Sequence, residues 1–367
     1  MSLLTDINLK ALELGIPISV HLDLTYRCNE RCIHCYLDHD DHGEMSTEEI
    51  KALLDQLCEA GVFFLVFSGG EVFMRRDFLE IVEYARRLQF NVKIKTNAVM
   101  IREKEAFRLR QLGVEQVQIS VYSHRPEVHD AITKVPGSFR RTVEAIRFLK
   151  SQHLKVTIAN VLMTANMGDG AGVIALAREL DVPYTLDPTI TPRMDGDTSI
   201  LALRAPGAQL QQVFHTPELV GNVDEFCAPP LPPGEEVKDD YPCSAGHTAC
   251  YISPYGDVFP CVQFPLPSGN VRRQKFIDIW RDSRELKDVR SIRMGDLPTC
   301  STCSHTGTCS RCPGLAYMEG NMRGPSTADC EKSFHRTGIP TANMLKKKDS
   351  RPPQGPLVNI QPLALTH

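Results

Sequence analysis

The chain has 367 residues, and 42% of them are hydrophobic, which suffices for a large core in one or two domains. Collagen-like, disordered and small disulfide-stapled proteins are therefore excluded. With 41 Lys and Arg against 45 Asp and Glu, the formal net charge is −4, so no global basic field favours nucleic acid or anionic lipid. The longest wholly apolar run, Val62–Phe67, is far shorter than the ~20 residues that span a bilayer. We expect a cytoplasmic protein without nucleic-acid or membrane partners.

The first half of the chain alternates short β-rich runs with helical patterns, in about six strand–helix units. Such units predict parallel strands with right-handed crossovers, hence a barrel or part of one, with ligands at the carboxyl ends of the strands. Strands are expected at Ile18–Leu24, Val62–Phe67, Val92–Thr96, Gln116–Val121, Lys155–Leu162 and Tyr184–Leu186. Helices are expected at Ser46–Ala60, Asp77–Gln89, Glu103–Leu112, Ser138–Gln152 and Ala171–Leu180.

The periodic pattern fades after about Arg204, and the proline-rich segment Cys227–Tyr241 indicates a stiff linker or covering loop. Beyond it, Thr248–Cys261 predicts a hairpin and Phe276–Arg290 a helix, within a cysteine-rich region that is too poor in apolar residues to fold on burial alone. We therefore expect a barrel over residues 1–204, a linker over 205–240, a metal-stabilised domain over 241–335 and a disordered tail over 336–367.

The 13 cysteines are unevenly placed: three lie between positions 28 and 35, two are isolated, and eight lie between positions 243 and 330. In a reducing compartment, such closely spaced cysteines favour metal or redox chemistry over structural disulfides. Of the isolated pair, Cys58 lies among leucines of a predicted helix and is interpreted as a core thiol, and Cys227 is interpreted as a spare thiol.

The first three cysteines, Cys28, Cys32 and Cys35, follow directly on the first predicted strand. Three thiolates of one short loop can hold three corners of a cubane iron–sulfur cluster and leave the fourth iron open to another ligand. The alternative is a zinc site or free thiols, but a structural zinc site needs four ligands, and no fourth candidate lies nearby.

This CxxxCxHC pattern, followed by Tyr36, resembles the signature of radical S-adenosylmethionine (SAM) enzymes. The resemblance implies a [4Fe-4S] cluster that binds SAM, and reductive cleavage of SAM to a 5′-deoxyadenosyl radical. It also implies a SAM site, because Gly69-Gly70-Glu71 after the second strand matches the family's GGE motif. The other positions implied in SAM binding are His34 by the adenine, Asn97 after the third strand, Ser120 by the ribose and Arg141 by the carboxylate. Taken singly, these residues also fit ordinary turn, loop and surface positions.

The eight later cysteines would close two four-iron clusters or two tetrahedral zinc sites. With four residues between Gly256 and Cys261, they resemble the SPASM extension, which carries two auxiliary [4Fe-4S] clusters in peptide and cofactor maturases. The resemblance implies that Cys243, Cys250, Cys261 and Cys312 hold the nearer cluster, and that Cys300, Cys303, Cys309 and Cys330 hold the farther one. The two residues between Cys309 and Cys312, where the family usually has three, leave the partition of ligands open.

The combined expectation is an α/β fold: a partial (β/α)6 TIM-like radical SAM barrel followed by a small Cys-rich iron–sulfur SPASM domain. Two electron-accepting clusters favour net oxidation, so we expect an oxidoreductase that modifies, and cross-links, a ribosomally made peptide. The alternatives are a maturase of a tetrapyrrole or quinone cofactor precursor, and a non-catalytic iron–sulfur electron-relay protein. The substrate is expected at the barrel mouth, with contacts from among Tyr122, Ser123, His124, Arg125, Asp187, Thr191, Arg193, Asp195 and Asp197.

Two further partners follow from this interpretation. Reduction of the SAM-binding cluster needs an external electron donor such as flavodoxin or ferredoxin. Only 27 residues precede Cys28, so leader-peptide recognition is expected to use the SPASM surface or a separate leader-peptide-binding protein.

Overall fold

A computed structural model describes residues 3–230 and 241–349 of the chain. Its strands form a single sheet in the order β6-β5-β4-β3-β2-β1-β7-β8-β9, and the first six strands run parallel, in chain order. The strands are β1 (Ser19–Thr25), β2 (Phe64–Gly69), β3 (Asn91–Thr96), β4 (Gln116–Ser120), β5 (Lys155–Val161), β6 (Tyr184–Asp187), β7 (Ala249–Ile252), β8 (Asp257–Phe259) and β9 (Gly269–Asn270).

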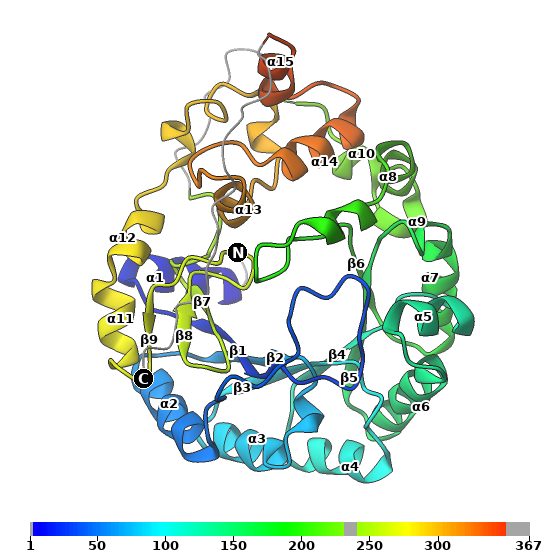
Figure 1. The fold of residues 1–367 in the computed structure, drawn as a ribbon, viewed down its shortest axis with the longest axis vertical. Coiled ribbons are helices and arrows are strands. Elements are labelled where there is room, and N and C mark those ends of the chain that lie inside the picture. The colour runs from blue at the N-terminus through cyan, green and yellow to red at the C-terminus, as the bar shows by residue number, and fades with distance from the viewer. Residues whose placement is uncertain (1–2, 231–240, 350–367) are drawn as a thin grey trace.

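Helices follow the parallel strands and lie around the outside of the curved sheet (Figure 1). Alternate strand residues such as Leu65, Phe67, Val92 and Ile94 belong to one hydrophobic core that also contains Ile81 of a covering helix. The helices of this half are α1 (Leu3–Leu14), α2 (Thr47–Glu59), α3 (Phe78–Arg87), α4 (Glu103–Gln111), α5 (Pro126–Thr133), α6 (Ser138–Ser151) and α7 (Gly170–Glu179).

The six predicted strands and five predicted helices of the barrel are confirmed, each within two residues of its expected ends. The predicted capping box of α2 is present, because Ser46 Oγ accepts from Glu49 N (3.2 Å) and Glu49 Oε2 accepts from Ser46 N (2.8 Å). Helices α1 and α5 were not anticipated. The prediction of an α/β partial barrel is therefore correct.

The cysteine-rich half is continuous with the barrel sheet. The predicted hairpin is confirmed as β7 and β8, and β7 pairs in parallel with β1, so that Tyr251 lies opposite His21. In Figure 1 the β7–β9 strands lie beside β1, and helices α13 to α15 gather beyond the open side of the barrel. The remaining helices are α8 (Gly207–Phe214), α9 (Pro217–Val220), α10 (Val223–Phe226), α11 (Phe276–Asp282), α12 (Arg284–Arg290), α13 (Pro313–Met318), α14 (Thr327–Thr337) and α15 (Ala342–Asp349).

Three expectations about the second half differ from the structure. The helix predicted over Phe276–Arg290 is two helices, because extended Ser283 ends α11 and caps α12 through Leu286 N (3.3 Å). The expected linker contains the helices α8 to α10, which are too short for the sequence to show a clear helical period of hydrophobic residues. Residues 231–240 of the linker lie outside the described part. The expected disordered tail is wrong for its first part, since α14 ends at Thr337 and α15 reaches Asp349; residues 350–367 also lie outside the described part.

Within the described residues, no helix is long and apolar enough to cross a membrane.

Candidate functional site

The first cysteine loop, residues 26–36, begins where β1 ends and brings three thiols together. Its backbone is fixed on the neighbouring helix α5, because Arg31 N and Ile33 N donate to the carbonyls of Thr133 and Ile132, each at 3.0 Å. Burial raises the pKa of Cys28 to about 12, and it raises the pKa values of Cys32 and Cys35 as well. These thiols are therefore protonated at neutral pH until a metal takes the place of the proton.

The glycines of the Gly69-Gly70-Glu71 motif allow close contact between the β2 loop and the first cysteine loop. Gly70 N donates to Thr25 O (2.7 Å), and Glu71 N donates to Arg27 O (2.9 Å). A Cβ atom on Gly69 would lie 2.1 Å from Thr25 O, and one on Gly70 would lie 2.3 Å from Arg27 O. Gly69 also adopts φ +136°, which other residues rarely reach. Glycine is thus required at both positions by the backbone of the cysteine loop itself.

Glu71 is fully buried and joins the ends of β2 and β3. Its carboxylate accepts from Thr96 Oγ1 (2.8 Å), Asn97 N (2.9 Å) and Phe73 N (3.0 Å). Burial raises the pKa of Glu71, and the hydrogen bonds from Phe73, Thr96 and Asn97 oppose that rise. In this structure Glu71 therefore shapes the two loops around the cysteines, which the sequence motif alone did not show.

Of the other predicted SAM contacts, Asn97 touches the first cysteine loop. The Asn97 amide donates to Asn29 Oδ1 (2.7 Å) and lies 3.8 Å from Cys28 Sγ. Arg141, on the first turn of α6, donates to the carbonyls of Pro136 and Gly137, both at 3.2 Å. Ser120 is half-buried at the end of β4.

His34 packs edge-on against the ring of Tyr122, with 4.8 Å between the ring centroids. Its Nδ1 is buried and has no hydrogen-bond partner among the described residues, and burial lowers the pKa of His34 to about 4. A neutral imidazole with an unpaired buried nitrogen suits an additional polar ligand at this position. Asn97 and Glu71 thus hydrogen-bond to the first cysteine loop, and the contacts of all the predicted residues with SAM remain predictions.

Glu30, between Cys28 and Cys32, was not anticipated as a site residue. Its side chain is 2% exposed, and the Cys32 thiol donates to its Oε2 (3.5 Å). Burial raises the pKa of Glu30 to about 8. A charged residue inside a cysteine motif is the sequence signal that would have identified it.

Several predicted substrate contacts have structural roles instead. Ser123 is fully buried and donates to Asp169 Oδ2 (2.5 Å), and Arg125 donates to Asp169 Oδ1 (2.8 Å). The Tyr122 ring is buried between His34 and His129. These side chains fix the loop after β4 on the start of α7, because their polar groups are satisfied within the protein.

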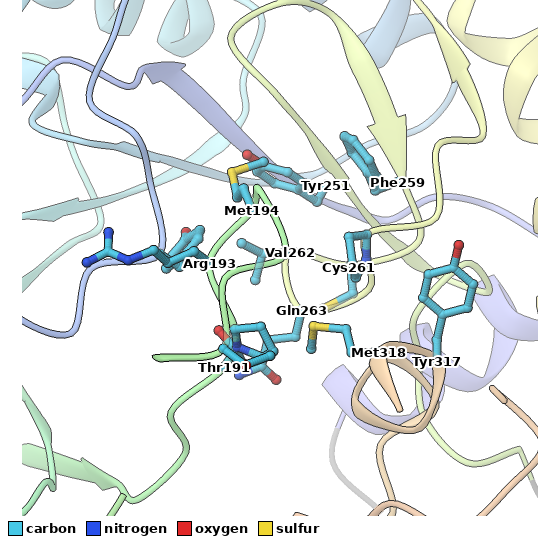
Figure 2. Close-up of a pocket in the computed structure, with 15 residues that line it drawn as sticks. Thr191, Arg193, Met194, Tyr251, Phe259, Cys261, Val262, Gln263, Tyr317 and Met318 are labelled. Atoms are coloured by element: carbon cyan, nitrogen blue, oxygen red, sulfur yellow. The ribbon is translucent and has the colours of Figure 1, made fainter. Parts of the chain in front are cut away.

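A central pocket lies between the first cysteine loop, the loop after β6 and the segment that follows β8. Met194 N donates to Tyr36 O (3.0 Å), so the loop after β6 is bound to the cysteine loop. In Figure 2, Arg193 extends away from the other labelled side chains, and it lies 3.6 Å from Asp197. The lining residues are Tyr36, Thr191, Pro192, Arg193, Met194, Gly196, Thr198, Tyr251, Phe259, Cys261, Val262, Gln263, Pro265, Tyr317 and Met318.

A polar group inside the barrel adjoins this pocket and was not predicted. Tyr251 donates to Asp23 Oδ2 (2.9 Å), and its hydroxyl lies 2.8 Å from that of Tyr26. Asp23 is fully buried, with Oδ1 3.2 Å from His21 Nε2. Burial lowers the pKa of Lys95 on β3, while the charge of Asp23 opposes that change. The group joins β1 to β7, and no local pattern in the sequence could indicate it.

The later cysteines form two groups. One pocket, called here the C-terminal cysteine pocket, is lined by Cys300, Cys303, Cys309 and Cys330. The other cysteines lie nearer the barrel. Burial raises the pKa of Cys243 to about 11, and the neighbouring Cys312 and Cys261 thiols add to the rise. Four thiols around one pocket fit a closed [4Fe-4S] cluster, whose four irons each take one thiolate.

Cys250 is buried, whereas Cys58 is exposed. Cys250, on β7, belongs to the main hydrophobic core, and its nearest electrostatic neighbours are Arg290 and Cys261. Its role as a cluster ligand remains a prediction. Cys58 is exposed, so its interpretation as a core thiol is wrong; Leu53, Leu54 and Leu57 fill the buried face of α2 instead. Among the described residues, no group of three or more His, Cys, Asp or Glu side chains is close enough together to hold a single metal ion.

Comparison with known proteins agrees with this geometry. Residues 22–171 match the Radical SAM superfamily, and residues 243–313 match the SPASM iron–sulfur cluster-binding domain. Mycofactocin maturase MftC of Mycobacterium tuberculosis is 31% identical over 322 residues, which cover 84% of this chain and 81% of that protein. The AdoMet-dependent heme synthase of Methanosarcina barkeri is 27% identical over 82% of this chain and 92% of that protein.

The fold also matches Streptococcus suis SuiB bound to its precursor peptide SuiA, with a TM-score of 0.72 and 18% identity, over 88% of this chain and 78% of that chain. The predicted enzyme class, the SAM-binding [4Fe-4S] cluster and the auxiliary iron–sulfur domain are confirmed. The chain therefore belongs to the radical SAM superfamily and carries a SPASM iron–sulfur cluster-binding domain.

Proposed function

We propose that this enzyme oxidises a ribosomally made peptide, held in the central pocket. The observation that carries this proposal is the position of the pocket. Its lining runs from Tyr36, next to Cys35, to Cys261, two residues after the end of β8. A substrate there lies between the first cysteine loop and the nearer group of later cysteines.

The ligand assignments are those that the family resemblance implies, and the C-terminal cysteine pocket supports the set for the farther cluster. We propose that Cys28, Cys32 and Cys35 hold the SAM-binding cluster, and that the C-terminal cysteine pocket holds the farther auxiliary cluster. Cys243, Cys250, Cys261 and Cys312 are proposed for the nearer cluster. When bound, these groups supply one-electron chemistry that removes a hydrogen atom from an unreactive carbon and accepts an electron from the substrate.

The side chains of the protein position the reactants and exclude water. Glu71 and the two glycines before it fix the loops after β2 and β3 against the first cysteine loop. The central pocket is mainly apolar, with rings from Tyr36, Tyr251, Phe259 and Tyr317. Such a lining keeps water away from a reactive substrate and packs against an apolar or aromatic side chain.

The pocket favours a peptide over a tetrapyrrole. A tetrapyrrole precursor carries several carboxylates, which need several basic partners when they are buried. Of the residues that line the central pocket, Arg193 is the only Lys or Arg, and Asp197 lies 3.6 Å from it. Gln263 and Thr191 offer the neutral hydrogen-bonding groups that suit a peptide backbone. The heme synthase relative nevertheless makes a tetrapyrrole precursor the second candidate.

The partners and domain limits are part of the same proposal. An external donor such as flavodoxin or ferredoxin would reduce the first cluster, and a separate leader-peptide-binding protein would present the substrate. We propose a barrel unit over residues 1–204 and an auxiliary-cluster unit over residues 241–335, with α14 and α15 completing the second unit.

The decisive experiment uses short peptides encoded beside the gene. The reconstituted, reduced enzyme is incubated anaerobically with SAM and each peptide, with and without any neighbouring small peptide-binding protein. Oxidation by two hydrogens predicts a mass loss of about 2 Da per event. Reactions without SAM serve as the control. An unchanged peptide in samples that still form 5′-deoxyadenosine, together with turnover of a porphyrin precursor, contradicts the peptide proposal.

A further inference from the structure

The wall of the C-terminal cysteine pocket contains two buried hydrogen-bond donors that have no partner. Besides the four cysteines, Thr341 and Arg311 line this pocket. Thr341 is 2% exposed and Arg311 is 4% exposed. Within the described residues, neither Thr341 Oγ1 nor Arg311 Nη1 makes a hydrogen bond. Buried polar groups are normally paired, so the two atoms indicate that a bound acceptor completes them.

Thr341 stands where a hydroxyl usually caps a helix. It directly precedes α15, and the backbone bond from Leu345 N to Thr341 O (3.1 Å) begins that helix. At such a position a Thr hydroxyl normally accepts from an N–H group of the first turn. The hydroxyl of Thr341 makes no bond of this kind in the described chain, and it lines the cysteine pocket instead. Its proton is therefore available to an acceptor inside the pocket.

The guanidinium of Arg311 is fixed by backbone carbonyls on one side. Its Nε and Nη2 donate to Gly324 O, at 3.2 and 2.7 Å, and Nη2 also donates to Met322 O. The acidic side chain of the pocket wall, Asp329, pairs with Lys332 (2.7 Å) rather than with Arg311. The planar group is thus held in one orientation, with Nη1 left to donate.

The acceptors that fit this pocket are the sulfur atoms of an iron–sulfur cluster. The backbone already makes one such bond, because Ala342 N donates to Cys303 Sγ (3.5 Å). Hydrogen bonds to the sulfurs are one of the factors that set the reduction potential of a cluster. A donor stabilises the reduced cluster more than the oxidised one, because the reduced cluster carries one more negative charge.

We propose that Thr341 and Arg311 donate hydrogen bonds to the sulfur atoms of the farther auxiliary cluster and thereby raise its reduction potential. This inference rests on the proposed assignment of that cluster to the C-terminal cysteine pocket. It adds the start of α15 to the cluster site, although Thr341 lies beyond residues 243–313, which match the SPASM domain. A higher potential makes the farther cluster a better acceptor of a single electron.

The test measures a potential rather than turnover. Anaerobic redox titration of the reconstituted enzyme, followed by electron paramagnetic resonance, gives the midpoint potential of each cluster. The signal that disappears on joint replacement of Cys300, Cys303 and Cys309 by Ala belongs to the farther cluster. T341V, which removes the hydroxyl at nearly the same size, should shift the one-electron equilibrium of that cluster about tenfold towards the oxidised form, a decrease of about 59 mV. The other two potentials should not change.

Two variants serve as controls. T302V makes the same substitution next to Cys303, at an exposed residue whose hydroxyl donates to Thr299 O (3.4 Å), and T341S keeps the hydroxyl in the pocket. Both should retain the wild-type potential of the farther cluster. R311Q removes the other donor and should also lower this potential; an unchanged value in R311Q would overturn the role of Arg311.

The remaining outcomes are distinct, with iron and sulfide measured on each sample. An unchanged farther-cluster potential in T341V overturns the proposal, and so does an equal decrease in T341S, since that indicates an effect of packing. If T341V loses iron, T341A gives the potential without the hydroxyl. If both lose about four iron atoms, the hydroxyl retains the cluster rather than sets its potential, and the proposal is wrong. If replacement of the three cysteines removes no signal, the cluster assignment fails rather than the role of Thr341.

Discussion

At the scale of single residues, the contact between Gly70 and the first cysteine loop leaves no room for a side chain at position 70. A Cβ at position 70 would lie 2.3 Å from Arg27 O and 2.5 Å from Tyr26 O, which are backbone atoms that cannot rotate away. The hydrogen bond from Gly70 N to Thr25 O fixes the same approach. The Gly69-Gly70-Glu71 motif is thus a packing requirement of the cysteine loop, besides its predicted role in SAM binding.

We therefore expect Gly70→Ala to displace the cysteine loop. The variant should lose about four of twelve iron atoms per chain, the content of one cubane, together with SAM cleavage. Iron analysis and 5′-deoxyadenosine formation measure this. Gly168→Ala is the matched control, because a Cβ there meets nothing within 4 Å. Full iron content in Gly70→Ala would contradict the packing argument.

His129 makes stability depend on pH. Its neutral Nδ1 accepts from Tyr122 N (3.2 Å), and burial lowers its pKa from 6.5 to about 4. The unfolded chain then binds more protons than the folded one below pH 6.5, so stability falls as the pH decreases from 6.5 towards 4. Between pH 7.5 and 5.5 this single group should cost about 1 kcal/mol.

Urea unfolding at these two pH values measures the effect. His129→Gln keeps an acceptor for Tyr122 N but does not titrate, so its free energy of unfolding should change less with pH than that of the wild type, by about 1 kcal/mol. An equal pH dependence in both proteins would show that His129 does not titrate as expected.

At the scale of secondary-structure elements, the pairing of β7 with β1 holds the two halves together. Four residue pairs connect the strands, and the Tyr251 hydroxyl reaches across to Asp23. Since Asp23 is fully buried, loss of this donor leaves a carboxylate oxygen unsatisfied.

Tyr251→Phe should consequently lower the free energy of unfolding by about 1–3 kcal/mol, the cost of an unsatisfied buried group. Denaturant unfolding of the reconstituted protein measures it. Tyr255→Phe removes a hydroxyl that donates to Asp40 O (3.0 Å) at an exposed position, and it should cost clearly less. If both substitutions lowered the free energy of unfolding equally, the buried hydrogen bond to Asp23 would stabilise the protein no more than an exposed one.

At the scale of the whole molecule, the cysteines fall in three regions of the structure. The first cysteine loop lies at the carboxyl end of β1, Cys261 lines the pocket, and the C-terminal cysteine pocket lies farther along the chain. With the proposed ligand assignment, SAM cleavage would take place at the first loop and electron transfer at the later cysteines.

Joint replacement of Cys28, Cys32 and Cys35 by Ala should abolish dithionite-driven 5′-deoxyadenosine formation, because these residues alone are proposed to leave an iron open for SAM. Replacement of Cys300, Cys303 and Cys309 should remove a similar amount of iron, about four atoms per chain, yet preserve SAM cleavage. Persistence of cleavage in the first variant would refute the assignment of the SAM-binding cluster.

The sequence by itself determined the barrel and the ligand types. Hydrophobic periodicity and turn residues are local, so the strand and helix limits of residues 18–180 came close to the observed ones. The spacing of Cys28, Cys32 and Cys35 within one loop is local as well, and so is the capping box of Ser46.

Tertiary structure alone decided which distant groups meet. The pairing of Tyr251 with Asp23 joins residues 228 positions apart, and the Arg125–Asp169 ion pair turns an expected substrate contact into a structural one. The exposure of Cys58 and the burial of Glu30 likewise depend on what packs against them. Burial and long-range pairing are properties of the folded chain as a whole, because they depend on neighbours that no local window of sequence contains.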